Sequence, residues 1–504
     1  MKSVRCYLFP RLSPALLPMA LATLFGLQGC AQLSPAAITR SVQIASASTS
    51  QILCLTAFVS GMDPADTYRD EIRPAAGFGL IDWALKYEVD RDRHEVTTTI
   101  FGTARRRAVY REGLGCIIDF GSVPATTWQR APVPNGFIDP FPSLAAPEVV
   151  RTANPRIAAS IDAAFKEPSS GPKRRTQAVV VVHRGQLIAE RYADDVRIDT
   201  PLQGHSISKS VTHALIGRLV ANGKIDPDQA VDIPAWKGAD DPRARITPNQ
   251  LLAMSSGLPW DQYAGGWDES TRMWFTEADP YAYSISVPAK ASPGVEWNYS
   301  NLGYAVLSRL IRDKAGAGEA GSIASAPLGS ARGVAEGAAR DVTEGAARGV
   351  LEFAERELFA PLGMRTPVLN FDVTETPGGS SLFLASARDW ARFGLLYLRG
   401  GATDTQRILP ADWVKGASVP TLDAGYGRSF WLNHTDTAHP LPGHWGMKGA
   451  PADAYFARGY LGQFIVIVPS LDLVIVRLGI SYRKGGDIDT VGQMVGEISD
   501  AVSR

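Results

Sequence analysis

Residues 204–213, GHSISKSVTH, combine three serines and a lysine immediately before the apolar run ALIGRLVANGKI. Ser206 and Lys209 are three positions apart, so on a helix they lie on one face. In the first turn of a helix, backbone N–H groups and the positive end of the dipole favour a developing negative charge. A lysine near a serine hydroxyl can take its proton when burial or neighbouring charges lower the lysine's pKa. The stretch therefore indicates a nucleophile, Ser206, partnered by Lys209.

The same spacing also fits a polar helix start with no catalytic role. Two further Ser-x-x-Lys matches begin at Ser170 and Ser481, the first in a Gly/Pro turn and the second after a predicted strand. Neither opens a strong helix. Ser208 and Ser210 lack the three-residue spacing to the lysine. The motif alone leaves the catalytic and the structural interpretation open.

A second polar cluster precedes another helix-like run, in EWNYSNLGYAVLSRLI (296–311). It contains Tyr299 and Asn301, which form the only Tyr-x-Asn of the chain. A tyrosine beside a lysine can shuttle a proton, and an asparagine can hold the lysine or a substrate carbonyl. The alternative is a buried tyrosine followed by a helix cap.

Hairpin patterns stand at both ends of the region that contains these motifs. AVVVVHRGQLIAERYA (178–193) and GQFIVIVPSLDLVIVRLG (462–479) each predict two strands around a short turn, and TVGQMVGEISDAVSR predicts a closing helix. Terminal strands with helices between them predict an α+β domain whose two ends share one antiparallel sheet.

The order Ser-x-x-Lys, Tyr-x-Asn, late hairpin resembles the serine β-lactamase/penicillin-binding superfamily. Within it, the chain is similar to class C β-lactamases, related esterases and D-peptidases, and 6-aminohexanoate-oligomer hydrolases. LLAMSSGL (251–258) and FAERELFAPLGM (353–364) resemble two further landmarks, so the similarity covers residues 150–504. The resemblance implies a β-lactamase/transpeptidase-like fold, an antiparallel sheet flanked by helices with an all-helical lobe.

The resemblance also implies roles for individual residues. Ser206 is the acylated nucleophile, Lys209 its hydrogen-bonded partner, Tyr299 the proton-transfer residue and Asn301 a polar positioner. Backbone N–H groups of Ser206 and Ala457 form the implied oxyanion hole. Three residues flank the expected strand edge and are candidate substrate contacts, with a structural role weighed for the last: Tyr455, Arg458 and Gln463.

One family motif, Lys-Thr/Ser-Gly, is absent from the chain. Alignment places Ala454-Tyr455-Phe456 at its position, which removes the lysine that would meet a β-lactam or peptide carboxylate. This departure argues against β-lactamase and D-amino-acid peptidase activity, which remain the alternatives. DAYFARGYLGQF is closer to the 6-aminohexanoate-oligomer hydrolase branch, so we expect an acyl-enzyme hydrolase of amides or esters. A non-catalytic penicillin-recognising binding protein is the alternative of another class.

The first 30 residues resemble a lipoprotein-type signal peptide. Lys2, Arg5 and Arg11 precede an apolar stretch that ends in Leu-Gln-Gly-Cys30. We expect Cys30 to be lipidated and the protein to face the periplasm from the outer membrane, or to be secreted if it is not lipidated. A plain secretory signal and an uncleaved anchor are alternatives. We expect no later stretch to span a membrane, which limits membrane contact to the lipid anchor.

The remaining boundaries follow composition. Residues 31–50 are small and polar and predict a tether, and 51–122 predict a β-rich module. Cys54 and Cys116 are the two cysteines outside the leader and Cys30, so an oxidising compartment predicts a disulfide, with two free thiols as the alternative. The other predicted segments are a proline-rich connector (123–150), the hydrolase domain (151–504) and a low-complexity Ala/Gly insertion within it (315–350).

Charge and motif searches limit the other function classes. The chain has 51 Lys and Arg against 51 Asp and Glu, so no basic excess indicates nucleic acid. Its seven histidines form no HExxH motif, and Gly204-x-Ser206-x-Ser208 lacks the last glycine of a nucleophile elbow. We expect no metal or cofactor and a small amide or ester as the partner, and the oligomeric state is open.

Overall fold

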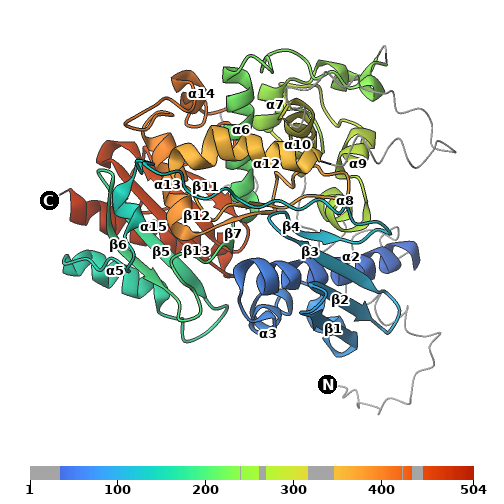
Figure 1. Cartoon of the computed structure of the whole chain (residues 1–504), viewed down its shortest axis with the longest axis horizontal. Helices are drawn as coiled ribbons and strands as arrows, with labels where there is room; N and C mark the ends of the chain where they lie inside the picture. Colours follow the sequence, from blue (N-terminus) through green and yellow to red (C-terminus); the bar gives the residue numbers. More distant parts are fainter. Residues whose placement is uncertain are drawn as a thin grey trace, which may run out of the picture.

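The computed structural model describes residues 35–238, 240–259, 268–315, 345–422, 424–433 and 446–503. The predicted leader with Cys30, and most of the predicted insertion at 315–350, lie outside these residues. The described chain forms a smaller N-terminal module and a larger α+β domain, which the 123–150 connector joins (Figure 1).

A six-stranded antiparallel sheet forms the centre of the α+β domain, in the order β10-β11-β12-β13-β5-β6. Strands β13 and β5 pair directly, with Val474 opposite Val182, so the two predicted hairpins share one sheet as expected. Every residue of β12 and β13 is buried because helices cover both faces of the sheet. The strands are β5 (Thr176–His183), β6 (Gln186–Tyr192), β10 (Trp431–Leu432), β11 (Tyr455–Gly459), β12 (Gln463–Val468) and β13 (Leu473–Gly479).

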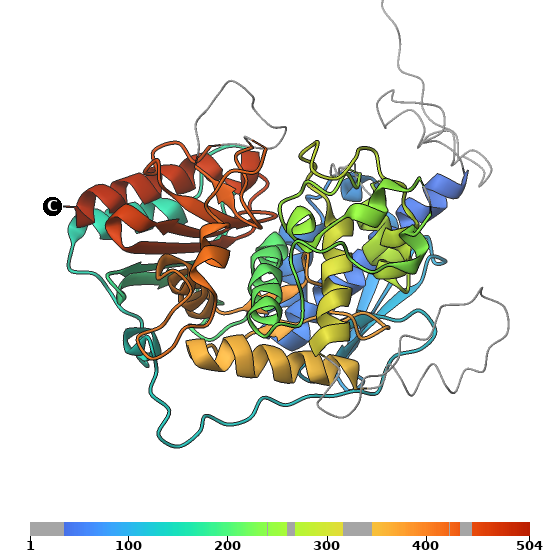
Figure 2. The same cartoon turned by 90° about the horizontal axis from the view of Figure 1, so that it is seen from above.

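Three helices cover this sheet. Helix α13 (Ala387–Leu398) packs on one face, where Gly394 allows close contact with Ile465 and Val474. Helices α5 (Pro155–Phe165) and α15 (Ile488–Val502) lie side by side along the opposite face (Figure 2). Helix α15 confirms the predicted closing helix.

A helical lobe borders the sheet at the β10–β11 edge. Its central helix, α6 (Ser208–Ala221), is buried on nearly all sides and packs against α10 (Asn301–Ala315). A helix surrounded by protein has no solvent face, which explains why its sequence lacks a clear polar stripe. The surrounding helices are α7 (Pro248–Leu252), α8 (Glu269–Thr276), α9 (Pro280–Ser286) and α12 (Ala346–Ala354).

Short elements complete the domain. A three-stranded sheet, β7-β9-β8, leads into the start of α6. Its strands are β7 (Leu202–Gln203), β8 (Val368–Leu369) and β9 (Phe383–Ala385). The remaining helical segments are η5 (Pro142–Ala145), η6 (His205–Ile207), η7 (Pro234–Trp236), η8 (Pro242–Arg245), η9 (Glu355–Phe359), η10 (Ala360–Leu362), α14 (Ala411–Lys415), η11 (Pro469–Leu471) and η12 (Lys484–Gly486).

The N-terminal module is a four-stranded antiparallel sheet, β1-β2-β3-β4, covered by helix α2 (Pro35–Cys54). The strands are β1 (Leu85–Asp90), β2 (Glu95–Ile100), β3 (Arg106–Arg111) and β4 (Gly115–Ile118). A disulfide joins Cys54 at the end of α2 to Cys116 in β4, as predicted. The module also contains η2 (Leu55–Ser60), α3 (Pro64–Thr67), η3 (Tyr68–Ile72), α4 (Phe78–Ile81) and η4 (Asp82–Ala84).

The predicted tether at 31–50 is wrong for the described part, which begins at residue 35. Residues 44–51 are buried against the sheet as part of α2. Three of their hydroxyl groups donate to carbonyls one turn back, and Ser50 Oγ donates to Thr98 Oγ1 at 2.9 Å. Small side chains with internally satisfied hydroxyls let a helix approach a sheet closely. The polar side chains suggested an exposed segment because the sequence does not reveal that their hydroxyl groups form hydrogen bonds within the helix.

By length and composition, the continuous helical segment Pro35–Ser60 is apolar enough to cross a membrane. The expectation that no stretch after the leader meets this criterion is therefore wrong. In the fold, however, 61% of its apolar window is buried, as in the core helix of a globular domain.

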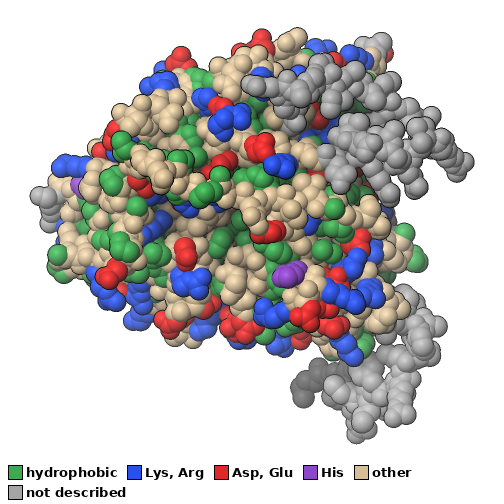
Figure 3. All heavy atoms as spheres, in the orientation of Figure 1, with side chains coloured by type: hydrophobic (Ala, Val, Ile, Leu, Met, Phe, Trp, Pro, Cys, Tyr) green, Lys and Arg blue, Asp and Glu red, His purple; other side chains and the backbone are tan. Residues whose placement is uncertain are grey.

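The connector crosses the face of the molecule from the module to the sheet domain (Figure 1). It is anchored along its length, because Arg130 Nε donates to Glu355 at 2.8 Å and Asp139 accepts from Arg392 at 2.6 Å. Acidic and basic side chains are interspersed over this face of the molecule (Figure 3), in keeping with the balanced charge.

Candidate active site

The turn that carries Ser206 is η6, which runs directly into α6. Gly204 N donates to Phe383 O at 2.9 Å, and Ser208 Oγ links the turn to β9 by donating to His205 O at 2.6 Å and accepting from Phe383 N at 3.0 Å. Ser210 Oγ donates to Ser429 O at 2.8 Å. The hydroxyl groups of the two neighbouring serines are thus bonded to the surrounding backbone.

Lys209 lies one turn further along, with its side-chain nitrogen buried. Its Nζ donates to Ser206 Oγ at 3.1 Å and to Ser380 O at 2.9 Å, and the residue is 1% exposed. The ring centroids of Tyr299 and Tyr304 lie 4.8 and 5.3 Å from the same nitrogen. The structure therefore brings three predicted residues together: the serine, the lysine and Tyr299.

The other Ser-x-x-Lys matches have no such geometry. Ser481 Oγ donates to Lys173 O at 3.1 Å, and Lys173 Nζ donates to Pro168 O at 3.2 Å. Both contacts end on backbone carbonyls at the edge of the sheet domain. Of the three matches, the one at Ser206 alone joins its serine hydroxyl to its lysine in the described residues.

The segment LLAMSSGL positions the loop that carries Tyr299. Asn298 N donates to Met254 O at 2.7 Å, and Ser300 N contacts Met254 Sδ at 3.3 Å. Gly257 has φ +79°, and a Cβ there would lie 2.1 Å from Ala291 O. A glycine is needed for both the left-handed backbone and the close approach.

Asn301 is the first residue of α10, directly after this loop. Its Nδ2 donates to Ser270 Oγ in α8 at 2.8 Å, and the residue is buried. The contact orients the amide beside the Tyr299 loop. It fits a positioning side chain that is itself held by the helical lobe.

Strand β11 lies against the serine turn. A Cβ at Gly459 would be 2.1 Å from Gly204 O, so the two backbones are in contact there. Ala457 is fully buried opposite Ile465 of β12. This strand is therefore adjacent to Ser206, as the predicted oxyanion hole requires.

The remaining strand-edge candidates differ in their surroundings. Tyr455 is buried, its ring packs edge-on against Phe430 at 5.7 Å, and burial raises the pKa of its phenol. Arg458 is partly exposed, with its guanidinium 5.7 Å from the Trp431 ring centroid. The triplet 454–456 therefore offers no cation, and Arg458 is the cation that β11 itself carries.

Gln463 does not have the predicted substrate-facing position. Its Nε2 donates to Tyr460 O at 3.1 Å and to Gly479 O at 2.5 Å, and its Oε1 accepts from Gly479 N at 3.1 Å. The amide ties the β11–β12 turn to the end of β13. Both ends of the side chain are occupied by backbone groups, which corrects the prediction to the structural role.

An aromatic wall that the sequence analysis missed flanks the site. Tyr299 stacks on Trp431 at 5.5 Å with an interplanar angle of 26°, and Trp297 packs against both rings. Tyr426 meets the same cluster edge-on. Trp297 lies in the quoted Tyr-x-Asn stretch and could have been suspected. Trp431 and Tyr426 carry no local motif, because only the fold brings them to Tyr299.

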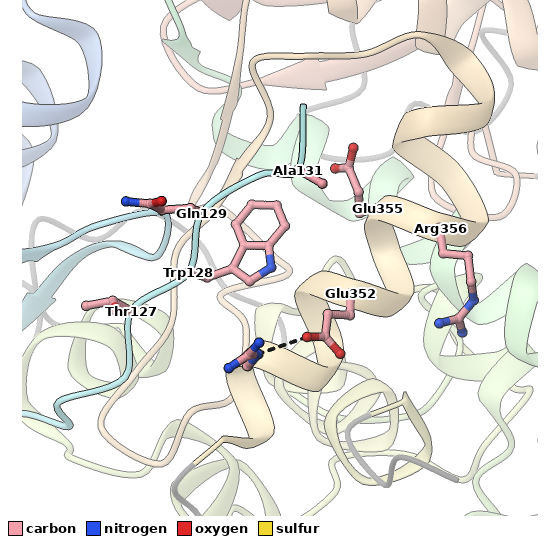
Figure 4. A pocket seen from close by; sticks show the side chains of 8 residues that line it. Thr127, Trp128, Gln129, Ala131, Glu352, Glu355 and Arg356 are labelled. Atoms are coloured by element: carbon pink, nitrogen blue, oxygen red, sulfur yellow. Dashed lines mark hydrogen bonds and ion pairs between the residues drawn. The ribbon is translucent and has the colours of Figure 1, made fainter. Parts of the chain in front are cut away.

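A pocket of about 530 Å³ lies away from Ser206, between the connector and α12 (Figure 4). Trp128 projects from the connector toward Glu352 of α12, and Glu355, the first residue of η9, lies on the same side. None of the predicted site residues lines it. Within the described ranges, no group of three or more His, Cys, Asp or Glu side chains is arranged to hold a metal ion.

Two solved structures resemble this chain over about two thirds of its length. One is a penicillin-binding protein homologue from Caulobacter crescentus, 15% identical, with a TM-score of 0.49 and coverage of 70% of this chain and 100% of that one. A Bacillus anthracis protein provisionally assigned as a 6-aminohexanoate-dimer hydrolase is 21% identical, with a TM-score of 0.49 and coverage of 66% and 80%.

Sequence comparison gives a curated relative that matches part of the chain, and a family. The D-alanyl-D-alanine-carboxypeptidase/endopeptidase AmpH of Escherichia coli K12 is 26% identical over 149 residues, which are 28% of this chain and 39% of AmpH. The chain thus matches well under half the length of that relative. The Beta-lactamase family model matches residues 161–320 and 331–479, more than half of the chain. With its antiparallel sheet, flanking helices and helical lobe, this chain belongs to the Beta-lactamase family, a family of hydrolases.

Proposed function

We propose that this chain is a serine hydrolase that cleaves an amide or an ester through an acyl-enzyme on Ser206. The observation that carries the proposal is the 3.1 Å hydrogen bond between Lys209 Nζ and Ser206 Oγ, at a lysine that is almost completely buried. A buried base held at hydrogen-bond distance from a hydroxyl is the arrangement that activates a serine nucleophile.

The reaction has two steps. Ser206 Oγ attacks the substrate carbonyl carbon while its proton moves to Lys209 Nζ. The tetrahedral oxyanion is held by the backbone N–H groups of Ser206 and Ala457. Tyr299, whose ring lies against Lys209, delivers the proton to the leaving nitrogen or oxygen. Water then attacks the acyl-enzyme, and its proton returns by the same route to Ser206 Oγ as the acid product leaves.

The surroundings of the site support a substrate with an apolar portion. Trp297, Trp431 and Tyr299 supply a broad aromatic surface next to the nucleophile. The family lysine that meets a carboxylate is absent, which favours small amides and esters such as 6-aminohexanoate oligomers over β-lactams and D-amino-acid peptides. Asn301 and Arg458 are the polar side chains that would orient the substrate.

We further propose that the chain is exported and is anchored by lipid on Cys30 at the outer membrane, facing the periplasm. The leader resembles a lipoprotein signal, and the Cys54–Cys116 disulfide is typical of an oxidising compartment. Palmitate labelling of the wild type and a Cys30→Ser variant in bacterial cells would test the anchor. Equal labelling of the two would rule it out.

The decisive test of the catalytic proposal is covalent labelling. The full chain is treated with a fluorophosphonate, and intact mass is compared for the wild type and Ser206→Ala. We expect a single adduct on the wild type and none on the variant. Hydrolysis of a panel containing aminohexanoate amides, short esters, a β-lactam and a D-Ala-D-Ala peptide then identifies the substrate class. A folded wild type that takes no adduct would favour the non-catalytic binding protein.

A further inference from the structure

The N-terminal module reaches the serine turn through η3. Its Glu71 Oε1 lies 3.9 Å from Nε2 of His205, the residue before Ser206, and each side chain is 11% exposed. This distance is longer than a hydrogen bond. No described residue donates a hydrogen bond to the Glu71 carboxylate. The imidazole is the one basic side chain that lies within 4 Å of this carboxylate in the described part of the chain.

A small cavity adjoins the same pair. It has a volume of about 40 Å³ and is lined by Thr56, Ser60 and Glu71 from the module and by Gln203 and His205 from the hydrolase domain. The cavity therefore leaves unfilled space beside the two side chains. Nearby, Ser60 Oγ donates to Pro201 O at 2.7 Å, which holds the module against the chain that leads into the turn.

The backbone conformation of His205 affects the position of Ser206. His205 has φ +46°, a left-handed conformation that costs energy for a residue with a Cβ. Its ring packs edge-on against Tyr460 at 5.7 Å, and the Tyr482 hydroxyl donates to Glu71 O. A strained residue keeps its conformation only when its surroundings hold it, and here one side of that support comes from the module. A shift of the His205 ring would move the next residue, Ser206.

We propose that Glu71 is a positioning residue for the nucleophile: its ionised carboxylate holds the His205 imidazole and thereby the turn that presents Ser206 to Lys209. The module is then part of the catalytic unit rather than an independent accessory. This inference rests on the proposed function of Ser206 and adds a pH-dependent contact to it.

The charges around the pair leave Glu71 as the group that titrates near neutrality. On its own element, Arg69 pairs with Asp70, and Asp70 also pairs with Arg175 of the hydrolase domain. The other facing groups are the phenols of Tyr460 and Tyr482, whose pKa values are raised by burial. Burial raises the pKa of Glu71 to about 7 and lowers the pKa of His205 to about 4. Between pH 6 and 8.5 the carboxyl therefore gains its charge while the imidazole stays neutral.

The test measures the rate of fluorophosphonate adduct formation on Ser206 in the full chain, at about pH 6 and pH 8.5. Glu71→Gln keeps the shape of the neutral carboxyl and cannot ionise. We expect it to match the wild type at the lower pH and to react about three- to tenfold more slowly at the higher pH. Asp66→Asn is the matched control, because it removes a carboxylate of the same module whose ion pair, with Arg69, is exposed and stays within the module. It should follow the wild type at both pH values.

A second variant tests whether Glu71 acts through His205. His205→Asn removes the imidazole and keeps a residue that tolerates the left-handed backbone. In this background, Glu71→Gln should have no further pH-dependent effect. The positioning role would be overturned if the labelling rates of the wild type and Glu71→Gln had the same ratio at both pH values, or if Glu71→Gln reacted faster at high pH. Neither result would affect the assignment of Ser206 as the labelled residue. A wild type without any adduct would instead refute the proposed function, and this inference with it.

Discussion

Lys209 shows how one residue combines local spacing with tertiary contacts. Its distance from Ser206 along the helix is local, whereas the Ser380 carbonyl and the Tyr299 and Tyr304 rings come from distant parts of the chain. These groups restrict the amine to one place in a dry environment. The hydrogen bond to Ser206 is therefore prearranged before substrate binds, which is how a side chain contributes most to catalysis.

Replacing this amine should remove acylation while leaving the fold. Lys209→Met keeps most of the apolar chain, so we expect the rate of Ser206 labelling to fall by about 10²- to 10⁴-fold. Ser380 O loses a donor, which should cost about 1–3 kcal/mol of stability. Labelling kinetics and urea unfolding measure the two effects.

Lys484→Met is the matched control for Lys209→Met, because Lys484 also follows a serine by three positions but lies exposed at the domain edge. It should label like the wild type. Undiminished labelling of the Lys209 variant would remove this lysine from the mechanism.

At the scale of elements, the site depends on a segment that acts through the Tyr299 loop. The segment LLAMSSGL holds the Tyr299 loop through two backbone contacts to Met254. Its own position depends on Gly257, whose backbone carbonyl accepts from Lys290 N at 2.8 Å. LLAMSSGL thus has a physical role, since it positions the Tyr299 ring against Lys209.

Gly257→Ala should disturb this element more than a glycine change in open space. The new methyl group meets Ala291 O, and the residue keeps φ +79°, so both steric overlap and backbone strain arise. Gly294→Ala is the matched control, because φ is +83° there but the nearest atom is 3.4 Å from the Cβ.

The control should lose about 1–2 kcal/mol from strain alone. Gly257→Ala should lose more and should also label more slowly with fluorophosphonate. Equal stability losses and normal labelling in both variants would show that the close approach is unimportant. Urea unfolding together with labelling kinetics distinguishes these outcomes.

Helix α2 is an element whose position could not be predicted from its sequence. Its sequence, PAAITRSVQIASASTSQILC, suggested an exposed tether, yet it covers the sheet of the module. The β-type pattern of 95–118 was predicted correctly because alternation within a strand is local. A helix of small residues has no strong apolar stripe, so only its partner reveals the buried face.

For the whole molecule, the docking of the module makes stability depend on pH. Burial raises the pKa of Glu71 from 4.5 to about 7, so the folded chain binds a proton that the unfolded chain releases. The stabilisation from this proton is complete below pH 4.5 and is lost as pH rises through 7. His205 acts in the opposite direction, since its pKa falls from 6.5 to about 4, and its contribution is lost as pH falls through 4.

The variant Glu71→Gln isolates the contribution of Glu71 to the pH dependence of stability. The variant should match the wild type in unfolding free energy near pH 4.5 and exceed it by up to about 3 kcal/mol near pH 8. Urea unfolding at the two pH values measures the difference, and a difference that does not change with pH would contradict the burial of this carboxyl. If Glu71→Gln is more stable than the wild type at high pH but is labelled more slowly, the ionised Glu71 lowers the stability of the fold while it positions the nucleophile.

Features that depend on short separations along the chain, or on elimination, could be predicted from the amino-acid sequence. The Ser206–Lys209 pair follows from helix spacing, the hairpins from alternation, and the disulfide from having two cysteines to pair. Three further features emerged from the folded chain: α2 is a core helix, Gln463 ties strands together, and Glu71 faces His205. These contacts join segments far apart in the chain, and no local pattern encodes a partner that arrives only when the two units dock.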